Sequence, residues 1–105
     1  METTYLDDKG VWLVEIDGDL DLYSVPELRK VVNDCVSERK SDFLFDCSQM
    51  SFIDSTGLGE LASLMKNVKS YEGTITIKGI KPHIKKVFLI TGLNTIFNID
   101  GEANE

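Results

Sequence analysis

Hydrophobic positions along this chain alternate between the spacing of strands and the spacing of helices. Apolar residues at every second position in residues 11–16 share one face of a strand: Trp12, Val14 and Ile16. A short strand at Tyr5-Leu6 and a polar turn precede this run. The chain therefore begins with a predicted β-hairpin.

Three later stretches repeat apolar residues at helical spacing. The first follows Ser24-Val25-Pro26-Glu27, a capping-box pattern with Ser24 as N-cap and Glu27 at the third helical position. The second ends near Gly73. The third begins at Pro82 and ends at Gly92, a residue type that commonly terminates helices.

Strand patterns separate these predicted helices. Residues 42–46 hold an apolar run between carboxylates, typical of a central strand covered on both faces. Residues 74–78 alternate as a half-buried strand does, and residues 96–99 suggest a short final strand. The order ββαβαβα(β) predicts an α/β fold with a mixed, mostly parallel sheet, an N-terminal hairpin and about three to four helices packed mainly on one face. Loops 18–24 and 48–57 should meet at the carboxyl ends of the strands, where such folds place their sites.

Length and charge narrow the possible functions. A chain of 105 residues predicts one domain, with its core at about 4–99 and a frayed acidic tail at about 100–105. The net charge is −7, and residues 1–60 hold fourteen Asp/Glu against five Lys/Arg, so nucleic acid is not an expected partner. No apolar run is long enough for a membrane span and no signal peptide is recognisable, which favours a cytoplasmic protein.

Familiar catalytic and metal-binding patterns fail here, so we expect no enzyme, cofactor or metal. The acidic loop at residues 17–21 lacks the later Gly and Glu of a calcium loop, and Gly57-Leu58-Gly59 lacks the lysine of a P-loop. His83 is the only histidine, and nothing in the spacing brings it to Ser55 as a catalytic base. The two cysteines fit small core positions.

The turn Asp54-Ser55-Thr56-Gly57 is the most informative segment, because it joins a strand to the start of a helix. Unpaired N–H groups and partial positive charge make that position favourable for phosphate. The same residues are also ordinary helix caps. From spacing alone the turn is a cap or a modification site, and one serine can serve as both.

Here the residues resemble a known family. Strand, Asp54-Ser55-Thr56-Gly57-Leu58-Gly59, then helix is similar to the signature of bacterial anti-sigma factor antagonists, the stand-alone STAS domains. Gly18-Asp19-Leu20-Asp21 and Leu44-Phe45-Asp46-Cys47-Ser48 look like two further segments of that family, and the resemblance covers essentially the whole chain. The loop after Asp21 lacks the Ala- or Asn-rich run that many members carry, which leaves the cognate kinase open.

The resemblance implies a phosphorylation switch. In the family, the unmodified protein binds an anti-sigma factor that is also a serine kinase and thereby frees a sigma factor; a PP2C-type serine phosphatase reverses the modification. Carried over, Ser55 is the phosphorylated residue, and a monomer or weak dimer is expected because one strand edge is exposed. The implied partner-binding residues are Asp21, Tyr23, Ser24, Asp54, Ser55, Thr56, Gly57 and Leu58.

A second interpretation belongs to another class. A stand-alone STAS subunit that regulates a membrane transporter, or a component of a stress-signalling scaffold, would use the basic run from Lys78 to Lys86 to dock an acidic partner or lipid. Such a run is also typical of a solvated helix face.

Overall fold

The computed structural model describes residues 1–37 and 40–99, so the expected frayed tail at 100–105 lies outside the described residues. The observed order matches the predicted ββαβαβαβ pattern, with a short 3₁₀-helix added before the last strand. The elements are β1 (Glu2–Leu6), β2 (Val11–Leu20), α1 (Val25–Cys35), β3 (Asp42–Ile53), α2 (Ser55–Lys69), β4 (Thr74–Lys78), α3 (Pro82–Thr91), η1 (Leu93–Thr95) and β5 (Asn98–Ile99).

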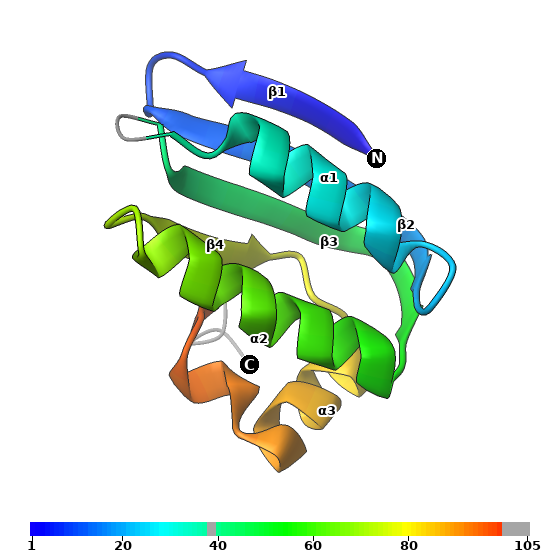
Figure 1. Cartoon of the computed structure of the whole chain (residues 1–105). Helices are drawn as coiled ribbons and strands as arrows, with labels where there is room; N and C mark the ends of the chain where they lie inside the picture. Colours follow the sequence, from blue (N-terminus) through cyan, green and yellow to red (C-terminus); the bar gives the residue numbers. More distant parts are fainter. Residues whose placement is uncertain (38–39, 100–105) are drawn as a thin grey trace.

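The strands form one mixed sheet in the order β1-β2-β3-β4-β5. β1 and β2 pair antiparallel, and every later neighbour pairs parallel, which confirms the predicted hairpin and parallel arrangement. Each crossover moves one place in the same direction, so right-handed connections bring the helices to the same face. Figure 1 shows α1 and α2 lying across one face of the sheet.

The core lies between the helices and that face of the sheet. Val14, Phe45 and Ile77 occupy alternate strand positions and are fully buried beneath the helices. Leu44 projects to the opposite face and is only partly buried. The expectation that residues 42–46 form a strand covered on both faces is therefore wrong, because all the crossovers cover the same face.

The two central strands are longer than their hydrophobic patterns predict. β2 continues to Leu20 and β3 to Ile53, and these two residues pair at the end of the parallel ladder. Register shifts between Glu15 and Asp17, and between Gly18 and Asp19, break the alternation in this stretch. The segments predicted as loops do meet at the carboxyl ends of the strands, but much of their length is paired strand.

Candidate functional site

The turn between β3 and α2 presents a serine to solvent. Asp54 is the N-cap of α2, and its Oδ1 accepts a hydrogen bond of 2.9 Å from the Gly57 N–H. Ser55 is the first helical residue and is exposed, and its hydroxyl has no hydrogen-bond partner within the described part of the chain. The expectation that Ser55 also caps the helix is therefore wrong: the neighbouring carboxylate takes that role, and the hydroxyl is accessible.

Gly57 fixes the position of this turn. It is buried, and a Cβ added there would lie 2.4 Å from the backbone oxygen of Leu20 and 2.9 Å from Cγ1 of Ile53. The same Leu20 oxygen accepts a hydrogen bond of 3.3 Å from the Asp54 N–H. The first turn of α2 thus packs directly on the end of β2, and only glycine permits that approach.

The β2–α1 loop beside this turn is held by its own side chains. Asp21 Oδ1 accepts hydrogen bonds from the N–H groups of Tyr23, at 2.9 Å, and Ser24, at 3.2 Å. The Ser24 hydroxyl donates to the carbonyl of Asp19 at 2.7 Å and accepts from the Asp21 N–H at 3.0 Å. Asp21 and Ser24 therefore shape the loop that carries Tyr23.

The predicted capping box at the start of α1 is wrong in its hydrogen bonds. Ser24 is the N-cap as expected, but its side chain makes no cap hydrogen bond. Glu27 instead pairs with the amino group of Met1 at 2.9 Å. Burial and that carboxylate affect the amine in opposite directions, and the hydrogen bond to Glu27 dominates and raises its pKa. The β2–α1 loop thus binds the Ser24 hydroxyl and the N-terminal amine binds the Glu27 carboxylate, the two groups that a capping box would use.

Three exposed apolar side chains lie at the ends of β2 and β3, the strands that lead to the Ser55 turn and the loop beside it. Tyr23 is 89% exposed, Leu22 is 63% exposed and Phe52 is 51% exposed. Leu22 and Tyr23 follow the end of β2, and Phe52 precedes Ile53 at the end of β3, so all three extend from the strand ends that flank the Ser55 turn. Sequence reasoning selected Tyr23 but missed Leu22 and Phe52; the outward position of Phe52 becomes evident only once β3 is extended to Ile53.

The remaining predicted residues of the turn differ in their exposure. Thr56 is exposed next to Ser55, whereas Leu58 is half-buried against the core.

His83 donates from Nε2 to the Ser51 carbonyl at 2.9 Å, and this hydrogen bond joins the start of α3 to β3. Among the described residues no hydrogen bond joins His83 to Ser55.

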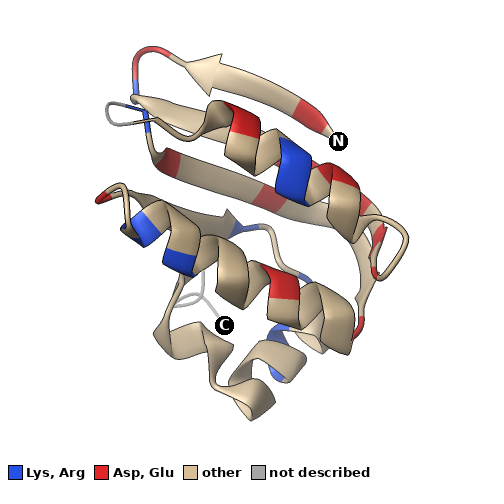
Figure 2. Ribbon diagram, in the orientation of Figure 1, with Lys and Arg blue, Asp and Glu red and all other residues tan. Residues whose placement is uncertain are grey.

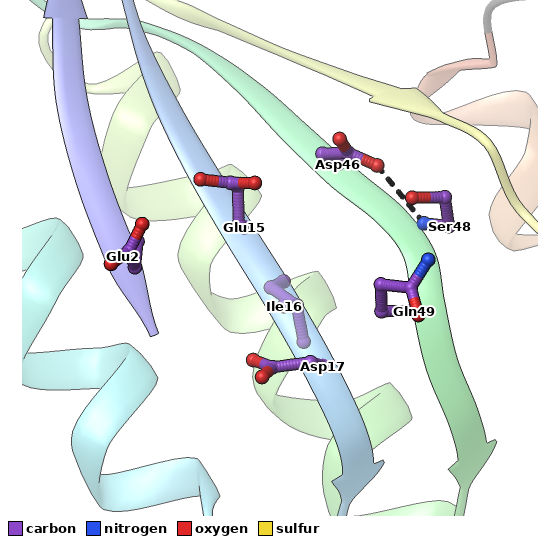
Figure 3. A pocket seen from close by; sticks show the side chains of 7 residues that line it. All are labelled: Glu2, Glu15, Ile16, Asp17, Asp46, Ser48 and Gln49. Carbon is purple, nitrogen blue, oxygen red and sulfur yellow. Dashed lines mark hydrogen bonds between the residues drawn. The ribbon is translucent and has the colours of Figure 1, made fainter.

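A separate acidic pocket of about 300 Å³ lies over β1, β2 and β3 (Figure 3). Asp46 in this pocket accepts a hydrogen bond of 3.0 Å from the Ser48 N–H. That bond, helped by the Ser48 hydroxyl and the charge of Lys78, outweighs burial and lowers the pKa of Asp46. The lining residues are Glu2, Glu15, Ile16, Asp17, Asp46, Ser48 and Gln49.

Four carboxylates in one pocket disfavour a phosphate-bearing ligand. Within the residues that the structure describes, no group of three or more His, Cys, Asp or Glu side chains is arranged to hold a metal ion. No helix in that part of the chain is long and apolar enough to cross a membrane. The Ser55 turn is the better candidate site, because an accessible hydroxyl there accompanies exposed apolar side chains at the ends of β2 and β3.

Comparisons with known proteins match nearly the whole chain. The family model for the STAS domain matches residues 5–105. An anti-sigma-B factor antagonist of Staphylococcus aureus (strain NCTC 8325 / PS 47) is 31% identical over 100 residues, covering 95% of this chain and 91% of the relative.

Two solved structures share the fold. An anti-sigma factor antagonist from Mycobacterium paratuberculosis superposes with a TM-score of 0.79 at 23% identity, covering 98% of this chain and 87% of the other. The Bacillus cell fate determinant SpoIIAA in its phosphorylated form superposes with a TM-score of 0.72 at 19% identity, covering 98% and 93%.

Proposed function

This chain belongs to the STAS domain family, and on that premise we propose that it is an anti-sigma factor antagonist controlled by phosphorylation of Ser55. In its unphosphorylated form it binds an anti-sigma factor that is also a serine kinase, and so frees a sigma factor. The observation that carries this proposal is the exposed Ser55 hydroxyl at the start of α2, in a chain 31% identical to an antagonist over nearly its whole length.

The geometry favours a switch that leaves the fold intact. Asp54 already caps α2, so phosphate on Ser55 replaces no structural hydrogen bond of that hydroxyl within the described residues. The phosphate adds about −1.5 to −2 charge, and the positive end of the helix dipole tolerates it. Modification therefore changes the surface that a partner meets without unfolding the domain.

The same charge weakens binding because the surrounding surface is apolar and acidic. Leu22, Tyr23 and Phe52 are exposed in the free protein. A partner that covers them would remove them from water, as the central contacts of an interface require. Pressing a phosphate into such an interface costs desolvation, and exclusion of water there strengthens its repulsion from the adjacent Asp54 carboxylate. A loss of about 1.4 kcal/mol lowers affinity tenfold, so a modest penalty releases the partner. Figure 2 shows acidic residues in red around the end of β2 and the start of α2.

We further propose Asp21, Tyr23, Ser24, Thr56, Gly57 and Leu58 as partner-binding residues, through direct contact or by shaping the two loops. The protein then acts by binding rather than catalysis, in the cytoplasm, and a PP2C-type serine phosphatase restores the binding form. β1 forms one edge of the sheet, which suits a monomer or weak dimer. The 31% identical antagonist favours this function over a transporter or scaffold subunit.

The test combines phosphate mapping with binding. The full chain is incubated with the anti-sigma factor of its source organism and ATP, modified residues are mapped by mass spectrometry, and affinity is measured by calorimetry. We expect phosphate on Ser55 alone. Ser55→Ala takes up no phosphate and keeps its affinity, while Ser55→Asp binds at least about tenfold more weakly, equivalent to about 1.4 kcal/mol.

Two control variants separate the site from general effects. Thr56→Ala removes the adjacent exposed hydroxyl and should still be phosphorylated, whereas Gln49→Glu adds a negative charge away from the turn and should bind normally. Phosphate uptake by Ser55→Ala would show that another residue is modified. Undiminished binding by Ser55→Asp would remove the electrostatic basis of the switch.

A further inference from the structure

A groove that the sequence did not predict runs along the C-terminal half of α2. It has a volume of about 500 Å³ and lies between α2 and the segment that follows η1. Ala62, Met65 and Ile96 give it an apolar floor, and Ile96 remains 40% exposed. Figure 1 shows the segment after α3 lying beside α2.

Two lysines flank this apolar floor. Lys66 and Lys69 both line the groove and are exposed, whereas no acidic residue lines it. Neither lysine forms an ion pair with any residue that the structure describes. In a chain of net charge −7, this face therefore combines apolar surface with unneutralised positive charge. Figure 2 shows basic residues in blue toward the end of α2.

The groove continues the helix face that begins at the phosphorylation turn. Ser55, Gly59, Ala62 and Lys66 are separated by four, three and four residues, the spacing of one face of an α-helix. Gly59 also lines the groove. A partner seated over Ser55 would thus extend along α2 onto the lysines, an argument that rests on the proposed function.

From these observations we propose that the α2 groove (Gly59, Ala62, Ser63, Met65, Lys66, Lys69 and Ile96) binds an acidic amphipathic helix of the partner protein. Apolar side chains of that helix pack on Ala62 and Ile96, while its Asp or Glu side chains pair with Lys66 and Lys69. Two lysines in a strongly acidic protein are too few to hold a nucleic acid or an anionic membrane, whose charge the rest of the surface repels.

The probe is a synthetic amphipathic peptide of about 14 residues, long enough to form a helix, with leucines on one face and glutamates beside them. It is titrated into the full isotope-labelled chain, and amide shifts are followed by NMR. We expect shifts at residues 59–69 and 93–98 and weaker binding at higher salt. The double variant Lys66→Glu with Lys69→Glu should bind at least tenfold more weakly.

Matched controls determine whether the charge pattern is specific. A peptide with lysines in place of the glutamates should bind the parent poorly and the double variant better. Lys9→Glu combined with Lys86→Glu makes the same charge change at exposed residues outside the groove and should leave acidic-peptide binding unchanged. Amide dispersion of each variant verifies its fold.

Equal binding of both peptides, equal loss in the control variant, or shifts confined to other residues would each overturn the groove proposal. The titration contains no anti-sigma factor, so a negative result leaves the Ser55 switch standing. Conversely, an anti-sigma factor that binds Ser55→Asp as tightly as the parent would count against the switch, and the peptide result would still stand.

Discussion

Replacing Gly57 by alanine tests whether close contact between α2 and β2 positions the candidate site. The new Cβ would lie 2.4 Å from the Leu20 oxygen, and ordinary contact begins at 3.4 Å, so the helix start or the end of β2 must move by about 1 Å. Forced overpacking of this kind costs about 1–3 kcal/mol. The displacement also weakens the hydrogen bond from the Asp54 N–H to Leu20, worth about 1 kcal/mol.

Alanine gains at most about 1 kcal/mol over glycine in helix propensity, so the net expectation for Gly57→Ala is a loss of about 1–3 kcal/mol. Gly59→Ala is the matched control: it lies two residues further along the same helix, and an added Cβ meets nothing within 4 Å. That variant should gain about 0.5–1 kcal/mol.

Urea unfolding followed by Trp12 fluorescence gives the free energies, and thermal melts should separate the two variants by at least about 5 °C. A Gly57→Ala protein as stable as the parent would refute the reasoning, because it would mean that α2 moves away from Leu20 at no cost. The position of Ser55 would then not depend on this contact.

Two further predictions concern the cap and the buried thiol. Asp54→Ala should lower the free energy of unfolding, measured by thermal melts, by about 1 kcal/mol, because the Asp54 carboxylate caps α2. Ser55→Ala should lose little, because the Ser55 hydroxyl makes no cap hydrogen bond. Equal losses in the two variants would contradict the observed cap. Burial, aided by the charge of Asp46, raises the pKa of Cys47 from 9.0 to about 12, so its thiol stays protonated in the folded protein while the unfolded chain ionises. This contribution to stability is complete below pH 9 and is lost between pH 9 and about 12, by up to about 1.4 kcal/mol per pH unit. Alkaline urea titrations should therefore show a steeper decline for the parent than for Cys47→Ala, and parallel declines would rule the effect out.

Hydrophobic spacing was sufficient for the order of elements but not for their ends. β3 was expected at residues 42–46 and continues to Ile53. Ser48, Gln49 and Ser51 interrupt the apolar alternation, but the strand still pairs with β2 at residues 49, 50, 52 and 53. The third helix ends where its glycine predicted, since Gly92 adopts the left-handed conformation with φ of 79°. The end of α3 was predicted correctly because its signal lies in the local backbone, whereas the end of β3 depends on pairing with β2.

Side-chain hydrogen bonds were predicted less well, because several local partners compete for the same groups. Ser24 and Glu27 fit a capping box, yet one holds the preceding loop and the other binds the N-terminal amine. At the second helix the sequence offered three adjacent caps, and only the structure assigns the role to Asp54. The exposed side chains Leu22 and Phe52 were missed for a related reason: their exposure depends on which elements cover them.

The sequence by itself determined the class of fold, the strand-to-helix turn at Asp54 to Gly57 and its resemblance to a family, because these depend on spacing and residue type along the chain. The tertiary structure decided that Asp54 rather than Ser55 caps α2, and that Leu22 and Phe52 are exposed at the neighbouring strand ends. It also decided that Ala62 and Ile96, 34 positions apart, line one groove with Lys66 and Lys69. Such features arise when distant segments pack against each other, so no local pattern contains them.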